Sequence, residues 1–267
     1  MRKGTKMHTL MENLAQTLDC GQCFRWDRLQ DGTWEGVAYG KYLHITEENF
    51  SGVLRDPFWA DYFDMGTDYA GIRAGLCAKD STLAEAAHYA PEIHILRQEP
   101  WEALCSFILS QCNNIKRIKG MAARLCRAYG RNIGNGRFAF PEAETLALAD
   151  EGDLRALGFG FRAPYVISAA KSVAQGRIDF KVLKVMPLKE ARDVLTGLSG
   201  VGPKVADCTL LYGLHRMDAF PMDVWMKRAM KVLFPGKDPS WFGPYAGVAQ
   251  QYIFHYSRHH PELFQCA

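Results

Sequence analysis

The segment at 187–213, PLKEARDVLTGLSGVGPKVADCTLLYG, constrains the fold more than any other part of this chain. Apolar residues recur at three-to-four spacing on both sides of a turn that is rich in glycine. Pro187 and Pro203 suit the first turns of two helices, and Gly197 suits the end of the first. The segment therefore predicts a helix–hairpin–helix, with Lys204 at the start of its second helix.

The turn between these helices predicts an anion-binding site. Gly200 and Gly202 carry no Cβ atom that would keep a ligand away from the backbone. The second helix presents free N–H groups and a partial positive charge at its N-terminus. Together these features suit a DNA phosphate, although many helical hairpins turn on glycine for packing alone.

A carboxylate follows the hairpin in the segment DAFPMDVW, at 218–225. Pro221 ends an extended stretch and residues 224–234 show helical periodicity, which places Asp223 at a helix N-cap. A plain cap of this kind stabilises a helix by about 1 kcal/mol. With Lys204 at the start of the neighbouring helix, a catalytic site shared by the two residues is the alternative reading.

The rest of the chain divides into a strand-rich first third and a helical remainder. Strands are predicted in CFRWDRL, TWEGVAYG and KYLHITEE, with turns at Asp31-Gly32 and Gly40-Lys41. From about Asp56 onward, apolar residues follow the helical period, and the glycine-rich stretch at 130–136 is expected to form a loop. These patterns indicate an α+β fold, with an antiparallel β layer followed by a helical bundle.

Composition excludes several classes of protein. The formal net charge of +3 and the pI of about 8.4 permit a nucleic-acid partner without requiring one. No apolar run approaches 18 residues, and the N-terminus becomes polar too early for a secretory signal, so we expect a cytoplasmic protein. Only Cys20 and Cys23 form a CxxC pair, and reduced thiols are expected for all eight cysteines. The pair His259-His260 is expected to be a polar helix end and not a metal site.

Five ordered segments make the chain resemble a known family. They are GQCFRW at 21–26, SQCNNIKRIKGMAARLC at 110–126, LGFGFRAPYV at 157–166, LSGVGPKVADC at 198–208 with FPMDVWMKR at 220–228, and GPYAGVAQQYIF at 243–254. The sequence resembles the helix–hairpin–helix/Gly-Pro-Asp superfamily of DNA glycosylases, and within it the bacterial-type 8-oxoguanine DNA glycosylases. This resemblance implies a TBP-like N-terminal β domain at 1–95 and a helical glycosylase domain at 96–267.

The resemblance implies a bifunctional enzyme that removes a damaged base and then nicks the strand. Lys204 would attack C1′ of the sugar and hold it as a Schiff base, which requires a neutral amine. Burial and the positive helix end favour that neutral form. Asp223 would stabilise the positive charge that develops on the sugar.

The same resemblance assigns the residues that would bind the flipped base and the DNA. In the base pocket, a backbone carbonyl of the N-terminal segment would accept a hydrogen bond from N7–H of 8-oxoguanine, which guanine lacks. The implied base-pocket residues are Gly21, Cys208, Met222, Gln250 and Phe254. The implied wedge and opposite-base residues are Cys112, Asn113, Asn114, Arg117, Phe161 and Arg162. The implied phosphate contacts are Gly200, Gly202 and Trp225.

Cofactors and partners follow from the resemblance too. No four-cysteine cluster exists for iron–sulfur ligation, and no cofactor is expected to be required. A monovalent cation is expected on the backbone carbonyls of Thr196, Leu198 and Val201, where it would bridge to a DNA phosphate. The expected partner is double-stranded DNA that contains 8-oxoguanine. The protein is expected to act as a monomer and not to bind a membrane.

Two positions depart from the family pattern, and two alternatives remain. Cys112 stands where the eukaryotic pattern has an asparagine, and Trp225 stands where it has a phosphate-contacting histidine. One alternative is a glycosylase for another damaged base, which the Gly21 motif and the β layer argue against. The other is a non-catalytic DNA-binding protein, which would have no reason to keep Lys204 and Asp223 together.

Overall fold

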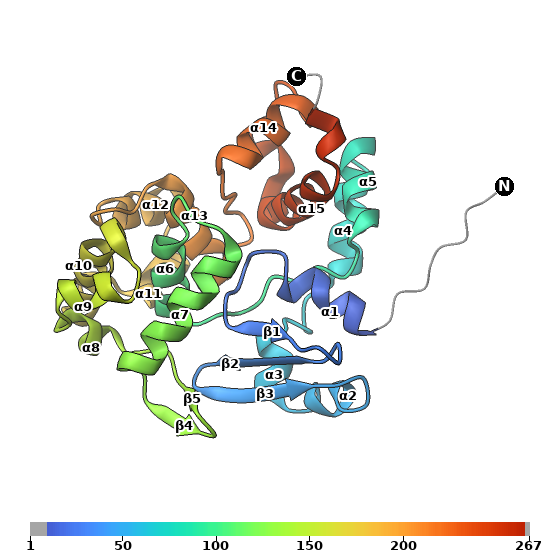
Figure 1. The fold of residues 1–267 in the computed structure, drawn as a ribbon. Helices are drawn as coiled ribbons and strands as arrows, with labels where there is room; N and C mark the ends of the chain where they lie inside the picture. Colours follow the sequence, from blue (N-terminus) through green and yellow to red (C-terminus); the bar gives the residue numbers. More distant parts are fainter. Residues whose placement is uncertain (1–9, 265–267) are drawn as a thin grey trace.

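The computed structural model describes residues 10–264 of the chain, and its first part contains a three-stranded antiparallel sheet (Figure 1). The strands are β1 (Trp26–Arg28), β2 (Trp34–Ala38) and β3 (Lys41–Ile45), paired in chain order. Tyr39 and Gly40 have φ angles of 51° and 70° and form the turn between β2 and β3. The expected strands are confirmed, and this turn begins one residue earlier than predicted.

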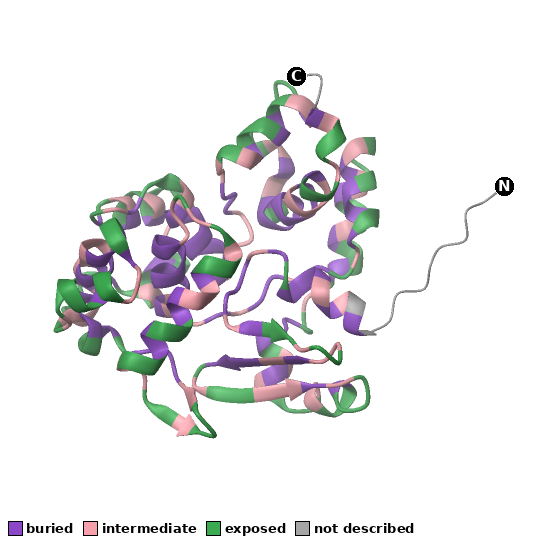
Figure 2. Ribbon diagram, viewed as in Figure 1, coloured by how far each residue is buried: buried purple, intermediate pink, exposed green. Residues whose placement is uncertain are grey.

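This sheet packs with α1 (Leu10–Leu18), α2 (Phe50–Val53) and α3 (Pro57–Tyr62) around an aromatic core. Two further helices, α4 (Tyr69–Cys77) and α5 (Ser81–Tyr89), contribute to the main hydrophobic cluster instead. Trp26 and Trp34, each 1% exposed, pack with Trp59 and Tyr62, and Trp26 Nε1 donates a 2.8 Å hydrogen bond to the Tyr62 hydroxyl. Figure 2 shows that β2 is mostly buried, whereas the edge strand β3 is mostly exposed or half-buried. The N-terminal layer therefore has a hydrophobic core of its own.

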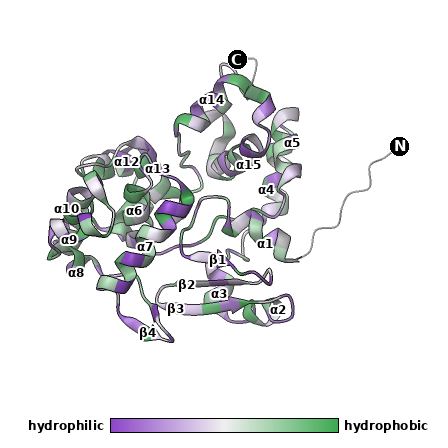
Figure 3. Ribbon diagram, viewed as in Figure 1, coloured by the Kyte–Doolittle hydropathy of each residue, from purple (hydrophilic) through white to green (hydrophobic). Residues whose placement is uncertain are grey.

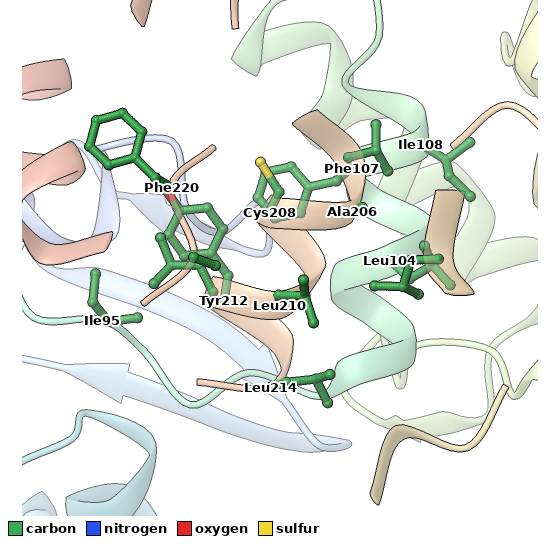
Figure 4. Packing of buried hydrophobic residues seen from close by; sticks show 14 of the residues in the cluster. Ile95, Leu104, Phe107, Ile108, Ala206, Cys208, Leu210, Tyr212, Leu214 and Phe220 are labelled. Carbon is green, nitrogen blue, oxygen red and sulfur yellow. The ribbon is translucent and has the colours of Figure 1, made fainter. Parts of the chain in front are cut away.

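The remainder of the chain is mostly helical, which confirms the expected α+β fold class. Its helices are α6 (Pro100–Leu109), α7 (Ile115–Tyr129), α8 (Ala143–Ala147), α9 (Glu151–Ala156), α10 (Ala163–Ala174), α11 (Phe180–Val185), α12 (Leu188–Thr196), α13 (Pro203–Cys208), α14 (Val224–Leu233) and α15 (Ala246–His259). Helix α6 is buried on nearly all sides because its sequence is almost entirely apolar. Helix α7 is amphipathic and carries hydrophilic segments along its length in Figure 3. Figure 4 shows Leu104 and Phe107 of α6 in the cluster that also holds Ala206 and Cys208 of α13.

The helix–hairpin–helix consists of α12, a turn and α13. Gly197 follows the last residue of α12 but keeps a right-handed φ of −67°, and the left-handed residue is Gly200, with φ of 76°. A Cβ atom at Gly200 would lie 2.2 Å from the ring of Tyr165, so this position also needs glycine for space. After α13 the chain continues as one π-helical turn, Thr209–Gly213, so the second helix of the predicted helix–hairpin–helix is not α-helical to its end.

The glycine-rich stretch at 130–136 is not a plain loop, so that expectation is wrong. Strands β4 (Asn132–Gly134) and β5 (Arg137–Phe138) pair as a small antiparallel hairpin. Asn135 and Gly136, with φ of 52° and 70°, form its turn. Asn-Gly is the strongest short hairpin signal in a sequence, and it was present here between the two strands.

A buried carboxylate joins the N-terminal layer to the helical part. Asp64, 1% exposed, follows α3, and its oxygens accept hydrogen bonds from four side chains. The donors are Thr67 and Tyr69 at 2.9 and 2.7 Å, Arg97 at 2.7 Å and His215 at 2.9 Å. The main hydrophobic cluster also includes residues of α4 and α5, and α15 packs against α5 (Figure 1). The two parts therefore share contacts that hold the site described below.

Three expectations concern cysteines, metals and membranes. Seven cysteines within 10–264 are free thiols, as expected, while Cys266 and the N-terminal segment 1–9 lie outside the described residues. Among the described residues, no group of three or more histidine, cysteine, aspartate or glutamate side chains could hold a metal ion. No helix in the described part of the chain has the length and apolar character needed to cross a membrane.

Candidate active site

Lys204 lies in the first turn of α13, half-buried beside the C-terminus of α6. Its Nζ donates a 2.9 Å hydrogen bond to Oγ of Ser110 and lies 5.0 Å from the centre of the Phe107 ring. Cys208 lies one turn further along α13 and is 2% exposed. Burial raises the pKa of Cys208 to about 12, although the nearby Lys204 charge lowers it in part. The Cys208 thiol is therefore neutral and presents an apolar surface.

Asp223 is the N-cap of α14, as the sequence predicts. Its carboxylate accepts a 2.7 Å hydrogen bond from the backbone N–H of Met226, and the side chain remains half-buried. One carboxylate oxygen thus caps the helix. The second oxygen is available to another partner, since a carboxylate has about four acceptor positions.

A cavity of about 390 Å³ brings the amine and the carboxylate together. This volume lies within the range of small-molecule sites, about 300–1,000 Å³. Its lining comprises Gly21, Phe24, Phe107, Ser110, Asn113, Asn114, Ile115, Ile118, Lys204, Asp223, Trp225, Phe254 and Arg258. A narrower space of about 50 Å³ shares five of these residues and adds Cys208, Tyr212, Pro221, Gln250 and Gln251. The two spaces together hold a primary amine, a carboxylate, an aromatic ring and buried amides.

Gly21 lines both spaces and has a φ of 86°. Its missing side chain would make only ordinary contacts, at 3.7 Å from Phe254 and Ile115, so the glycine is needed here for its backbone conformation. Among the described residues, no hydrogen-bond donor reaches the Gly21 carbonyl oxygen. The buried side chain of Gln22 fixes this segment by donating 2.8 Å and accepting 2.9 Å hydrogen bonds with the backbones of His94 and Leu96.

Gln250 lies in a chain of hydrogen bonds that fixes the orientation of its amide. Its Nε2 donates to the Pro221 carbonyl at 3.2 Å, so Oε1 must face the other way. That oxygen accepts hydrogen bonds from Tyr212 at 3.3 Å and from Nε2 of Gln251 at 3.0 Å. Met222, predicted in the same pocket, lines neither space and packs partly buried against the main core.

The asparagine segment reaches the cavity with two of its four predicted residues. Asn113 and Asn114 line the cavity, and Asn114 also caps α7 by accepting a 2.9 Å hydrogen bond from the Arg117 N–H. Cys112 is exposed in a left-handed conformation, with φ of 49°. Arg117 is exposed on α7 and does not line the cavity.

Phe161 and Arg162 differ sharply in exposure. Phe161 is 48% exposed, as a side chain that wedges into DNA requires. Arg162 is 4% exposed, and its guanidinium donates to the backbone carbonyls of Gln111, Cys112 and Phe159. A buried arginine with three carbonyl acceptors braces the loop at 111–112. The structure therefore does not present Arg162 as a free reader of an opposite base.

Of the three predicted phosphate contacts, the two glycines are placed as expected and Trp225 is not. Gly202 is exposed at the N-cap of α13, and Gly200 provides the left-handed turn. Trp225 lines the cavity, but its indole N–H donates a 2.9 Å hydrogen bond to Ser257. An indole has only one donor, so the expected phosphate contact through Trp225 N–H is not available in this arrangement.

The predicted cation site lies on the turn between α12 and α13. The Leu198 carbonyl accepts a 3.0 Å hydrogen bond from the N–H of Val201, and a carbonyl oxygen retains a second lone pair for an ion. The backbone carbonyl oxygens of Thr196, Leu198 and Val201 are thus chemically suited as ligands of a monovalent cation. Binding of this cation stays a prediction.

Sequence reasoning missed several side chains that form the site. Ser110 contacts Lys204, Phe107 lies under the same amine, and Arg258 lies 5.4 Å from the Phe254 ring at the cavity wall. Gln111 Nε2 donates a 2.9 Å hydrogen bond to the Gly200 carbonyl. The contacts of Ser110, Phe107 and Gln111 join residues far apart in the chain, whereas Arg258 and Phe254 lie one turn apart on α15. Only the inclusion of Ser110 and Gln111 in the quoted SQCNN segment hinted at their position.

Known families match the chain over most of its length. A family model described as "8-oxoguanine DNA glycosylase, N-terminal domain" matches residues 7–104, and one described as "HhH-GPD superfamily base excision DNA repair protein" matches residues 105–240. An N-glycosylase/DNA lyase of Saccharomyces cerevisiae is 40% identical over 154 residues, which cover 52% of this chain and 41% of the relative. A probable N-glycosylase/DNA lyase of Methanothermobacter thermautotrophicus is 33% identical, covering 61% of this chain and 62% of the relative. The chain thus spans less than two thirds of the length of these two relatives.

Longer matches extend over nearly the whole chain. N-glycosylase/DNA lyase OGG1 of Arabidopsis thaliana is 30% identical over 90% of this chain and 76% of the relative. The solved structure of 8-oxoguanine glycosylase/lyase from Clostridium acetobutylicum, in complex with double-stranded DNA containing cytosine opposite 8-oxoG, has a TM-score of 0.81 and 33% identity over 93% of this chain and 92% of that one. MBOgg1 in complex with a low-affinity DNA ligand has a TM-score of 0.83 and 38% identity over 92% of each chain. The chain therefore belongs to the HhH-GPD superfamily of base excision DNA repair proteins, among the members that carry an 8-oxoguanine DNA glycosylase N-terminal domain.

Proposed function

We propose that this protein is a bifunctional DNA glycosylase/lyase that excises 8-oxoguanine from double-stranded DNA. The observation that carries the proposal is the cavity in which Lys204, Asp223, Phe254 and the Gly21 backbone meet. A protein that only bound DNA would need the glycine hairpin and basic residues, but not an amine and a carboxylate in one hollow. The family membership and the names of the relatives support the same activity.

Lys204 acts as the nucleophile in this proposal. Its neutral amine attacks C1′ of the sugar, the C1′–N9 bond breaks, and the base leaves with its bonding electron pair. The amine then loses its protons as the sugar ring opens, which gives a Schiff base between Nζ and C1′. Removal of a proton from C2′ expels the 3′ phosphate and nicks the strand. Asp223 stabilises the positive charge on the sugar during the first step.

The lesion is recognised at the deeper end of the cavity. The Gly21 carbonyl, to which no described donor is bonded, accepts the N7–H that 8-oxoguanine carries and guanine lacks. Phe254 and the neutral Cys208 thiol flank the base, and Gln250 contacts its pairing edge. Extraction of the base from the helix costs a few kcal/mol, and these contacts offset that cost for the damaged base.

The DNA is held around the cavity by three segments. Exposed Phe161 fills the space left by the flipped nucleotide, while Asn113, Asn114 and Arg117 contact the strand near the opposite base. The hairpin at 198–202 binds a phosphate through its backbone N–H groups, with a monovalent cation on its carbonyls. Arg162 contributes by bracing the loop at 111–112.

Borohydride trapping tests this function directly. Duplexes that carry one 8-oxoguanine opposite cytosine are incubated with wild type and with Lys204→Gln in the presence of borohydride, and an undamaged duplex serves as control. A covalent adduct that forms only with wild type and only on the damaged duplex is expected. Adduct formation by Lys204→Gln, or equal adducts on both duplexes, would contradict the proposal.

A further inference from the structure

Ser110 accepts a hydrogen bond from the Lys204 amine. It follows the last residue of α6, lies 94 positions from Lys204 in sequence and lines the main cavity. The distance from Lys204 Nζ to Ser110 Oγ is 2.9 Å. A hydroxyl that touches the amine of a reactive cavity is placed to control where that amine points.

The protons of this contact can be assigned from a second hydrogen bond. Ser110 Oγ donates to the Phe107 carbonyl in the last turn of α6 at 2.7 Å. A hydroxyl has one proton, so only lone pairs remain on the side of Lys204. Ser110 must therefore accept from Lys204, and one N–H bond of the amine is directed at Ser110.

The same helix end holds the amine from a second direction. The Lys204 Nζ atom lies 5.0 Å from the Phe107 ring centre, and that ring stacks on Tyr212 at 5.2 Å and meets the edge of Phe24 at 5.5 Å. Lysine has a flexible four-carbon stem, so a single contact would leave its head free to rotate. With one N–H on Ser110 and the ring of Phe107 below, a neutral amine keeps its lone pair for the open cavity.

We propose that Ser110 is a positioning residue for the nucleophile, which accepts an N–H from Lys204 and so aims the amine lone pair at the sugar. The inference deepens the proposed function and rests on Lys204 as the attacking group. Misplacement of a reacting group by about 1 Å costs on the order of 100-fold in rate, so loss of this contact slows covalent attack and leaves DNA binding intact.

The test compares three variants on two substrates. Ser110→Ala removes the acceptor, and Ser110→Thr keeps a hydroxyl on the same carbon. Ser106→Ala is the matched control, because it removes a buried hydroxyl one turn earlier on α6 that does not line the cavity. Each protein is measured under single-turnover conditions on a duplex with 8-oxoguanine and on a duplex with a preformed abasic site. Rate of adduct formation under borohydride, DNA dissociation constant and melting temperature are recorded.

The expected result is a fall of about 10- to 100-fold in the adduct rate of Ser110→Ala on both duplexes, with unchanged DNA affinity. Ser110→Thr restores most of the rate and Ser106→Ala keeps it. Rates of Ser110→Ala within twofold of wild type would overturn the inference, and so would equal losses in the Ala and Thr variants or in Ser106→Ala. If wild type is trapped on the abasic duplex alone, the proposed 8-oxoguanine substrate fails, and the abasic duplex still decides the role of Ser110. If wild type is trapped on neither duplex, both proposals fail.

Discussion

Gln22 offers a quantitative test of how the base-recognition segment is held. Its side chain is 0% exposed and directly follows Gly21, whose carbonyl faces the cavity in the proposed function. Gln22 Oε1 accepts from the Leu96 N–H at 2.9 Å, and Nε2 donates to the His94 carbonyl at 2.8 Å. Nε2 also donates to the Thr17 carbonyl at 3.0 Å, which accepts from the Cys20 thiol as well. Substitution Gln22→Met keeps a similar volume and removes all of these contacts of the glutamine side chain.

The expected destabilisation follows from the Leu96 N–H and the His94 carbonyl, which lose their partner in this variant. Each becomes a buried polar group without a partner, which costs about 1–3 kcal/mol. The free energy of unfolding should therefore fall by about 2–6 kcal/mol, a large part of the 5–15 kcal/mol typical of a folded protein. The segment at 20–23 should also move, so excision of 8-oxoguanine should fall with it.

Urea denaturation measures this change, with Gln175→Met as the control. Gln175 is an exposed residue at the end of α10, and its substitution should alter stability by less than about 0.5 kcal/mol. A loss below about 1 kcal/mol in Gln22→Met would refute the reasoning. It would mean that water or a shifted backbone satisfies Leu96 and His94 without the glutamine.

Three further predictions follow from single positions. Asp223→Asn should keep the helix cap and DNA affinity yet slow base excision by about 100- to 1,000-fold, and equal single-turnover rates would reduce Asp223 to a plain cap. Gly200→Ala should lower the free energy of unfolding more than Gly176→Ala, since both have positive φ but only Gly200 faces the ring of Tyr165; equal melting temperatures would contradict this. Burial pushes the pKa of Asp64 up, but hydrogen bonds from its neighbours outweigh burial and lower it. The ionised Asp64 therefore stabilises the fold fully above its ordinary pKa of 3.8, and this stabilisation is lost as the pH falls through the lowered pKa. In urea titrations at acid pH, the free energy of unfolding of Asp64→Asn should depend less on pH than that of wild type. An unchanged pH dependence would refute this role of Asp64.

The sequence predicts the parts of this molecule that local patterns determine. Strand alternation, helical periodicity and the glycine turn predict the β layer, the helical remainder and the position of Lys204 at a helix start. Asp223 was placed at an N-cap because a proline precedes it and a helical pattern follows. The β4–β5 hairpin shows the limit of such reading, since Asn135 and Gly136 carried the signal but the short strands around them were too weak to support it.

The sequence alone does not predict contacts between distant segments. Ser110 meets Lys204 only because α6 ends beside the start of α13, and no local pattern records that approach. Arg162 resembled a free DNA-contacting cation in sequence, yet the loop at 111–112 supplies carbonyls that bury it. Trp225 likewise lies within reach of Ser257, which takes its single N–H.

The central claim is that the amine of Lys204 forms the covalent bond with DNA. The most direct measurement is peptide mapping by mass spectrometry of the borohydride-reduced adduct formed with an 8-oxoguanine duplex. We expect a deoxyribose fragment on the peptide that contains Lys204, and no other modified lysine. A fragment on the α-amino group or on another lysine, with Lys204 unmodified, would contradict the account.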